Sequence, residues 1–265
     1  MYVLHDIHIH THLSSCCMDK DATPENIIKI ASEKGLKTIG FSDHVWDNPA
    51  FIPSDWYRPQ NLEHILKIKQ ELPKDTYGVK VLIGCETEYC GNGVIGLSRE
   101  AASQMDYVLV PMSHTHQRGF VIPDKEYTNI EVAQLMVDYF KGVLNLDIAT
   151  GIAHPFAPLG FKDVDGILNC ISDEEFSECF SMAAEKGVSI EINAAIFHEA
   201  LGKYDDKCHD ESYIRIFKIA KKSGCLFHFG SDAHSLDNFK ERIEPLKKIV
   251  NDIGIEEKDI VPICR

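Results

Sequence analysis

The sequence predicts an α/β fold in which seven parallel strands, each followed by a helix, close into a barrel. Short apolar runs rich in β-branched residues alternate with longer amphipathic runs, which is the pattern of a parallel sheet with helical crossovers. Polar residues follow each apolar run at the same point, the expected carboxyl end of the strand. The 265 residues show no linker or repeat, so we expect a single domain over 1–265.

The expected strands are short and cover residues 2–9, 37–41, 79–85, 107–111, 148–153, 189–192 and 226–229. The first expected helix begins after Thr23, an N-cap residue followed by Pro24, and stops at Gly35. The other expected helices cover residues 61–72, 130–140, 173–186, 211–223 and 238–250. Gly187 and Gly224 end two of these helices directly before strands.

The residues at the strand ends distinguish a closed barrel from an open sheet. One polar residue per strand, at steps of about one strand–helix unit, gives the set His8, His44, Glu86, His114, His154, Asn193 and Asp232. A barrel brings the carboxyl ends of all its strands around one central site, whereas an open sheet uses only the strands beside its switch point. Polar residues at every strand end therefore favour a barrel with its site at the C-terminal face.

The charge, the apolar runs and the cysteines of the sequence exclude several classes of protein. The chain has 41 acidic and 27 basic residues and a net charge of −14, which repels nucleic-acid polymers. No run approaches the ~20 apolar residues of a membrane span, and the first residues lack the features of a secretory signal. The nine cysteines have no paired spacing, so we expect a reducing, cytoplasmic environment. The oligomeric state is left open.

The strand-end residues are of the types that bind transition metals. His8 and His10 lie two apart on one strand, so both imidazoles face the same side. Asp232 and His234 repeat this spacing on the last strand, which lies beside the first in a closed barrel. Mixed imidazole and carboxylate ligands suit Zn, Mn or Fe, and the set has room for two or three ions. Four other histidines are expected in the core or on the surface: His5, His64, His209 and His228.

The same motifs resemble, in order, those of the polymerase and histidinol phosphatase (PHP) superfamily. The matching segments are Asp6-Ile7-His8-Ile9-His10-Thr11, Phe41-Ser42-Asp43-His44, the Glu86 strand, Ser113-His114, Ala153-His154-Pro155, Glu191-Ile192-Asn193 and Gly230-Ser231-Asp232-Ala233-His234. The resemblance spans residues 6–234, and the length is similar to that of the stand-alone histidinol-phosphatase branch. It implies a distorted, TIM-like (β/α)7 barrel with two or three divalent metals, forming one metal-dependent phosphoesterase domain.

By position, the resemblance also implies a ligand set for each metal. The sets are His8, His10, Glu86 and Asp232 for one metal, Glu86, His114 and His154 for a second, and His44 and His234 with one further ligand for a third. This sequence has Cys16 where the family normally has a histidine. A Cys16 thiolate, a substitution by His12, and a weak or absent third metal remain as alternatives. Asp6 and Asp43 suit the orientation of ligand imidazoles.

The activity that the resemblance implies is hydrolysis of a small phosphomonoester. L-histidinol phosphate is the leading substrate, which would place the enzyme in histidine biosynthesis. A metal-bound hydroxide would attack phosphorus in line, with Asp232, Glu86 and His234 as the catalytic residues. A phosphoesterase acting on a nucleotide or a phosphotyrosine, an amidohydrolase, and a metal-binding module without turnover are the alternatives.

Basic residues near the strand ends are the expected phosphate clamps. Arg118 follows the fourth strand, and Arg58 lies in the long loop after the second. The histidinol-phosphatase branch tends to place a basic residue shortly after the sixth strand, whereas residues 194–198 contain no arginine. His198 and His116 are the substitutes nearby. This difference weakens the case for histidinol phosphate and leaves phosphoester hydrolysis unaffected.

Two loops complete the prediction. Residues 91–96 match the pattern GxGxxG but lie in the third strand–helix unit, so we expect a glycine-rich loop over the barrel mouth instead of a dinucleotide site. Residues 48–59, with Trp46, Trp56 and Tyr57 in and around them, are expected to form a lid with aromatic contacts to a ring-bearing substrate.

Overall fold

The computed structural model describes residues 4–197 and 210–265. The strands in this part of the chain are β1 His5–Ile9, β2 Thr38–Phe41, β3 Lys80–Ile83, β4 Cys85–Glu86, β5 Val108–Pro111, β6 Gly151–Ala153, β7 Ser189–Asn193 and β8 Phe227–Gly230. All neighbouring strands in the ladders are parallel. Each expected strand is present, and the expected start of the first at residue 2 lies outside the described residues.

The strands follow sequence order in two sheets, β1-β2-β3 and β4-β5-β6-β7-β8. The expected third strand is therefore divided at Gly84 into β3 and β4. A Cβ at Gly84, or at Gly40 in β2, would collide with the ring of Tyr107. This tyrosine is 2 % exposed, so the two glycines make room for a large ring inside the barrel where the first sheet gives way to the second.

The ring of strands closes where the ends of β1 and β8 meet. The backbone N–H of Asp232 donates to the carbonyl of His8 at 2.8 Å, and that of His10 donates to the carbonyl of Ala233 at 3.0 Å. No ladder joins β8 to β1 along their lengths within the described residues. The fold is thus an α/β barrel, as predicted, and its closure is concentrated at the C-terminal face.

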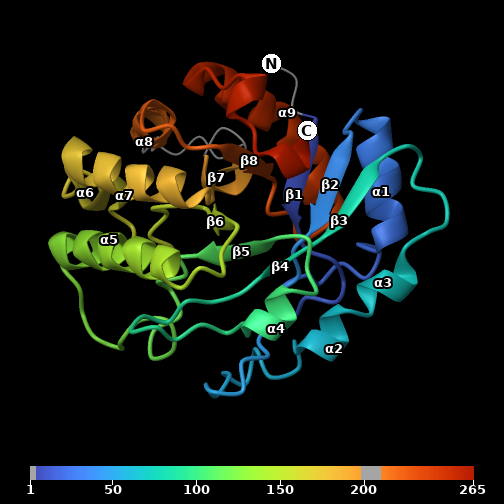
Figure 1. Ribbon diagram of the computed structural model, residues 1–265, viewed down its shortest axis with the longest axis horizontal. Helices are drawn as coiled ribbons and strands as arrows, with labels where there is room; N and C mark the ends of the chain where they lie inside the picture. Colours follow the sequence, from blue (N-terminus) through green and yellow to red (C-terminus); the bar gives the residue numbers. More distant parts are fainter. Residues whose placement is uncertain (1–3, 198–209) are drawn as a thin grey trace.

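Helices surround this barrel, with α5, α6 and α7 on one side and α1 on the other (Figure 1). The helices are α1 Pro24–Glu33, α2 Leu62–Ile65, α3 Ile68–Glu71, α4 Arg99–Ala102, α5 Asn129–Asn145, α6 Val164–Leu168, α7 Asp173–Lys186, α8 Asp210–Lys222 and α9 Leu236–Ile253, with the 3₁₀ turns η1 Ala194–Ile196, η2 Glu257–Asp259 and η3 Pro262–Cys264. None of the described helices is long and apolar enough to cross a membrane.

Local sequence signals fix most of these helix ends. Thr23 caps α1 through a hydrogen bond from the Asn26 N–H, and Pro24 is its first residue. Gly187 ends α7 with a φ of 68°, a conformation that glycine adopts without strain. The expected helix over 61–72 is two short helices, α2 and α3. The short helices α4 and α6 were not expected because one helical turn leaves no periodicity to detect.

The glycine-rich loop is a loop, as expected, and not the start of a nucleotide-binding helix. Residues 91–96 lie between β4 and α4, and Tyr89 and Ile95 form an antiparallel bridge across the turn.

Among the described residues, all cysteines are free thiols.

Candidate metal centre

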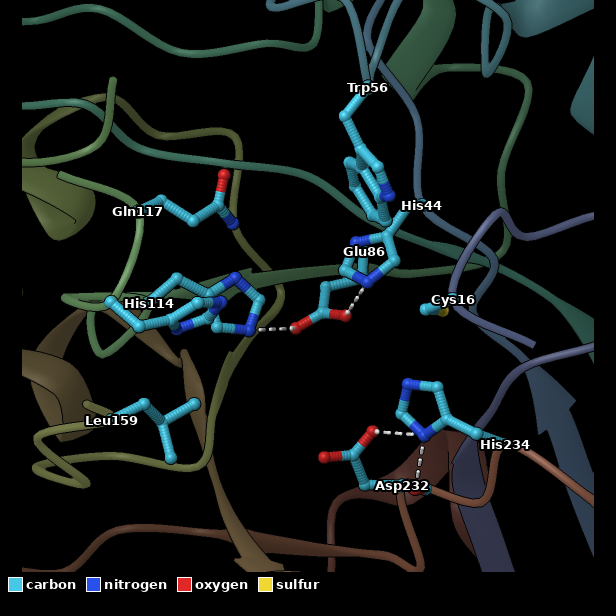
Figure 2. Close-up of a pocket in the computed structure, with 10 residues that line it drawn as sticks. Cys16, His44, Trp56, Glu86, His114, Gln117, Leu159, Asp232 and His234 are labelled. Carbon is cyan, nitrogen blue, oxygen red and sulfur yellow. Dashed lines mark hydrogen bonds and ion pairs between the residues drawn. The ribbon is translucent and has the colours of Figure 1, made fainter. Parts of the chain in front are cut away.

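Glu86, the last residue of β4, lies at the centre of a cluster of imidazoles (Figure 2). Its Oε2 lies 3.4 Å from Nε2 of His8, 3.4 Å from Nε2 of His10 and 3.3 Å from Nε2 of His44. The carboxylate of Asp232 approaches from the other side, with Oδ1 at 3.5 Å from Nε2 of His8 and 3.3 Å from Nε2 of His10. Two carboxylates from the two edges of the five-stranded sheet, β4 and the end of β8, thus face the imidazoles of His8 on β1 and of His10 just after it.

The second oxygen of Glu86 faces a different pair of histidines. Its Oε1 lies 3.1 Å from Nε2 of His154, at the end of β6, and 3.8 Å from Nε2 of His114, which follows β5. Glu86 is 1 % exposed. One buried carboxylate therefore contacts imidazoles from four strand ends, which is the convergence that the strand-end pattern predicts.

The outer nitrogen of each of these rings has its own partner. The partners of Nδ1 are Glu191 for His8 at 2.7 Å, Ser14 for His10 at 3.3 Å, Tyr57 for His44 at 3.3 Å, Glu88 for His114, and Ser113 for His154. A carboxylate on Nδ1 holds the proton there, so the lone pair of Nε2 points into the cluster. His8 and His10 bring their Nε2 atoms within 3.2 Å of each other. Convergent imidazole lone pairs and carboxylates are the donor set that a divalent transition metal requires.

Mutual electrostatics hold the cluster in charged forms. Burial raises the pKa of Glu86, but the neighbouring His44 and His8 and a hydrogen bond from His154 outweigh burial and hold this pKa well below its usual range. Burial likewise opposes the charge of His8, yet its carboxylate neighbours raise its pKa well above the usual value. For His114, burial is outweighed by Glu88, which raises the pKa to about 9. Without a cation, protons on the imidazoles compensate the buried carboxylates.

Three groups of side chains have ligand atoms close enough to share a cation. The groups are His8, His10 and Asp232; His8, Glu86 and His154; and His10, Cys16 and His44, with ligand atoms within 4.8 Å of one another in each group. The residues therefore fit divalent metals. His12 does not join the cluster: its Nε2 lies 3.2 Å from Oε2 of Glu71, which corrects the alternative that His12 ligates.

Cys16 lies among three of the imidazoles. Its thiol has side-chain hydrogen bonds with His10, His234 and His44. Burial alone would raise the pKa of the Cys16 thiol, but the charge of His10 and these hydrogen bonds lower the pKa to about 3. His234 lies beside it, with Nδ1 at 2.9 Å from the Asp232 carbonyl oxygen. Of the alternatives at the third site, the structure thus brings the thiol, and not His12, to the cluster.

The backbone at the site is strained and closely packed. His154 and Asp232 have φ values of 28° and 51°, a region that non-glycine residues rarely adopt and that is frequent at functional sites. A Cβ at Gly230 would lie 2.5 Å from the Cβ of His8 and would collide with Oε1 of Glu191. Only glycine at this position leaves room for the contact between Glu191 and His8.

A cavity of about 500 Å³ opens onto the cluster. Its lining comprises Cys16, His44, Trp56, Glu86, His114, His116, Gln117, Leu159, Asp232 and His234 (Figure 2). Trp56, 39 % exposed, stands at its edge, where its ring lies 5.1 Å from that of His44. Trp46 and Tyr57 are buried behind it. The expected lid thus contributes one aromatic side chain to the cavity.

The expected phosphate clamps do not reach this cavity, which corrects both assignments. The exposed Arg58 pairs with Asp55 at 2.8 Å. Arg118 donates to the Lys125 carbonyl at 2.9 Å, and its guanidinium lies over the ring of Phe161. Of the described residues, no lysine or arginine lines the cavity. His116 does line it, whereas His198 lies outside the described residues.

Asp6 and Asp43 position backbone and loop rather than imidazole rings. Oδ1 of Asp6 accepts from the N–H groups of His8 and Ser231, each at 3.1 Å. Asp43 accepts from the N–H and the hydroxyl of Thr11, both at 2.7 Å. The expectation that they orient ligand rings is therefore corrected: they fix the segments that carry the ligands.

The carboxylates that do orient rings, Glu88 and Glu191, were not assigned this role from the sequence. Glu191 also accepts from the backbone N–H of His154 at 2.5 Å and from Asn193 Nδ2 at 3.1 Å. Glu88 accepts from the Tyr57 hydroxyl at 2.5 Å. A signal was present for Glu191, which lies between Ile190 and Ile192 in an expected strand, because such a charge is buried only when it is paired. Glu88 follows Glu86 and Thr87 and gave no such signal.

The other described histidines agree with their expected places. The rings of His5 and Phe229 stack with centroids 4.4 Å apart, and Nδ1 of His228 lies 2.9 Å from the hydroxyl of Ser189. Nε2 of His64 lies 2.9 Å from the carbonyl of Leu13. His209 lies outside the described residues.

Comparisons with known proteins show which family and fold this chain resembles. A "probable phosphatase" of Caldicellulosiruptor saccharolyticus is 26% identical over 98% of this chain and 92% of its own length. A "probable histidinol-phosphatase" of Deinococcus radiodurans is 24% identical, over 94% of this chain and 93% of its own. The crystal structure of the Lactococcus lactis histidinol phosphate phosphatase, complexed with zinc, L-histidinol and phosphate, superposes with a TM-score of 0.62 at 19% identity, covering 97% of this chain and 95% of that one. This likeness shows the same barrel fold. The model of the PHP domain matches residues 6–195, and the chain therefore belongs to the PHP domain family.

Proposed function

We propose that this chain is a metal-dependent phosphomonoester hydrolase of the histidinol-phosphatase type. The observation that carries the proposal is the convergence of imidazole Nε2 atoms from four strand ends on the buried carboxylate of Glu86, at the floor of an open cavity. The family membership and the phosphatase names of the relatives support it.

Two cations would share the carboxylate of Glu86. His8, His10, Glu86 and Asp232 would hold one, and Glu86, His114 and His154 would hold the other. When bound, such ions polarise the phosphoryl group and activate water as a nucleophile. They also supply the positive charge that the lining lacks, because no described lysine or arginine reaches the cavity.

The protein's own groups position the reaction. Glu191 and Glu88 hold the rings of His8 and His114 through Nδ1, so each Nε2 keeps its direction when a substrate arrives. The phosphate of the ester would lie over Glu86 and Asp232, within reach of the amide of Gln117. Trp56 offers a ring face at the cavity edge for the alcohol part of the substrate.

L-histidinol phosphate is the substrate to test first. The solved relative from Lactococcus lactis holds L-histidinol and phosphate, and a ring-bearing alcohol suits the exposed face of Trp56. The absence of an arginine in residues 194–198 makes other small phosphomonoesters the next candidates. Free thiols among the described cysteines support a cytoplasmic enzyme.

The test is release of inorganic phosphate from L-histidinol phosphate by protein reconstituted with Zn²⁺ or Mn²⁺, with Asp232→Ala as the blank. A panel of nucleotide, aryl and sugar phosphates and an amide substrate follows under the same conditions. We expect turnover of at least one phosphomonoester, abolished in the blank. Hydrolysis of the amide alone, or no turnover of any ester with metal bound, would contradict the proposal.

A further inference from the structure

The geometry points to a thiolate metal site: Cys16, His44 and His234 would hold an additional cation next to the centre around Glu86, and this site would select Zn²⁺ over Mn²⁺ or Mg²⁺. The inference rests on the proposed metal-dependent function. It assigns to Cys16 a role that neither the family match nor the relatives' names contain.

Hydrogen bonds hold the loop that carries Cys16 next to the proposed site. The hydroxyl of Ser14 lies 3.3 Å from Nδ1 of His10 and accepts from the backbone N–H of His44 at 2.9 Å. Oε1 of Gln60 accepts from the N–H of Ser15 at 2.9 Å. The two residues before Cys16 are therefore fixed by contacts with the ring of His10, the backbone of His44 and the side chain of Gln60.

Three imidazole rings gather around this thiol. The ring of His10 packs between those of His44 and His234, with centroids 4.7 and 4.4 Å away. The ligand atoms of His10, Cys16 and His44 lie within 4.8 Å of one another. Cys16, His44 and His234 all line the cavity, and in Figure 2 the thiol lies between the two histidines. An ion at this point would be open to substrate on one side.

The neighbouring cysteine is excluded from the cluster, which makes the placement of Cys16 specific. The thiol of Cys17 donates to the backbone carbonyl of His234 at 3.1 Å, and also contacts the Asp19 carbonyl at 3.7 Å. It is thus directed at backbone oxygen, while the thiol of Cys16 lies within 4.8 Å of ligand nitrogens of His10 and His44. The two adjacent residues form a matched pair for experiments.

The donor set decides which ions the site prefers. Thiolate is a soft ligand that suits Zn²⁺ and Co²⁺, whereas Mg²⁺ and Mn²⁺ prefer oxygen. Catalytic zinc sites have three protein ligands, drawn from cysteine, histidine and carboxylate side chains, and one open position, and one thiolate with two imidazoles fits this pattern. The centre around Glu86 has imidazole and carboxylate donors only, so it lacks this preference for soft ions. The two halves of the cluster should therefore differ in metal selectivity.

The test is the absorption spectrum of the full chain titrated with Co²⁺. Wild type and Cys17→Ser should both develop a near-ultraviolet thiolate-to-cobalt charge-transfer band as well as the visible bands of bound Co²⁺. Cys16→Ser and Cys16→His should lose the charge-transfer band and keep visible bands, because the centre around Glu86 remains. Zn²⁺ should suppress the band at lower concentration than Mn²⁺, by at least tenfold. X-ray absorption of wild-type protein loaded with Zn²⁺ should show a sulfur neighbour at about 2.3 Å.

Each result separates this inference from the proposed function. A charge-transfer band that survives in Cys16→Ser, or a zinc protein without a sulfur neighbour, overturns the thiolate site. A charge-transfer band that depends on Cys16, without phosphatase activity, leaves the thiolate site standing and contradicts the proposed function. A chain that takes up no Co²⁺ overturns both. The X-ray measurement uses wild type only, so a variant that fails to fold does not prevent the test.

Discussion

The barrel contains two groups of buried histidines, and they behave in opposite ways. In the interior, His5 on β1 and His228 on β8 are 3 % and 0 % exposed. Burial, together with the charge of His228, lowers the pKa of His5 to about 3, and burial lowers that of His228 to about 4. At the C-terminal face of the barrel, which we call the rim, His8 and His10 are equally buried. Their pKa values are nevertheless raised well above the usual range.

The difference lies in the charged neighbours of each ring. Glu191, Asp232 and Glu86 raise the pKa of His8, and Cys16, followed by Asp232 and Glu86, raises that of His10. The ring of His5 instead stacks on Phe229. Where burial outweighs the nearby charges, as at His228 beside Glu191, the imidazole is neutral and structural; where several charged groups outweigh burial, the imidazoles form a site that attracts a cation. The predictions below break or sharpen this contrast, from the largest expected effect to the smallest.

Glu86→Gln should have the largest effect, because it removes the charge that the rim histidines share. Without this carboxylate the imidazoles lose their common counter-charge, and phosphatase turnover should fall at least 1,000-fold, or about 4 kcal/mol in barrier. Turnover and bound metal per chain measure it. Glu63→Gln, an exposed glutamate on α2, is the control and should match wild type. Full metal content and activity in Glu86→Gln would show that the rim does not depend on this residue.

His228→Phe tests the interior half of the contrast. A histidine whose folded pKa is about 4, below its unfolded value of about 6.5, contributes stability that is present above pH 6.5 and is lost as pH falls through 4. Urea unfolding should show wild type losing about 2 kcal/mol between pH 7 and pH 5 from this residue, and the variant should lose correspondingly less. The control is His64→Gln, which replaces a half-buried histidine on α2. This variant should keep the wild-type pH dependence of stability. Equal pH dependence in His228→Phe and wild type would contradict the assignment.

Glu191→Gln should weaken metal binding at the rim without removing a candidate ligand. The amide still accepts from the His154 N–H, but it no longer holds the His8 ring as a carboxylate does. Loss of such an outer partner costs about 10–100-fold in metal affinity, which competition with a chromophoric chelator measures. Glu185→Gln on α7, which is exposed, is the control. An unchanged affinity for both ions would show that Glu191 does not position the His8 ring for metal binding.

Trp56→Ala should have the smallest effect, since it touches only the substrate side of the cavity. We expect KM to rise several-fold, about 1 kcal/mol, with kcat and metal content unchanged. Ile52→Ala, on the same loop and 86 % exposed, should leave KM as it is. A change in kcat alone would place Trp56 in a different role.

The sequence was sufficient to predict the barrel, and to place the candidate ligands at one face of it, because both depend on periodic patterns. Apolar runs in alternation specify the strands, and the carboxyl ends of parallel strands meet at one face. For this reason the sequence places the candidate ligands His8 and His154 at that face. Cys16 could only be left among alternatives, because a loop position has no periodic constraint that fixes its direction.

The contacts that orient the ligands were beyond the sequence. Glu191 and Glu88 reach rings on strands far away in the chain, and which ring each reaches depends on side-chain packing. Arg58 and Arg118 failed as phosphate clamps for the same reason: their loops direct them to Asp55 and to the Lys125 carbonyl. Composition and order along the chain do not encode such directions.

The left-handed backbone at His154 and Asp232 has a consequence for engineering. Each such residue costs about 1–3 kcal/mol of folding stability, so selection for heat resistance alone should favour glycine or asparagine at these two positions. Those replacements would relax the chain and discard two of the candidate ligands at once. A thermostable variant of this protein is therefore better sought in the helices around the barrel, and any library that includes the rim should be screened for catalysis before it is heated.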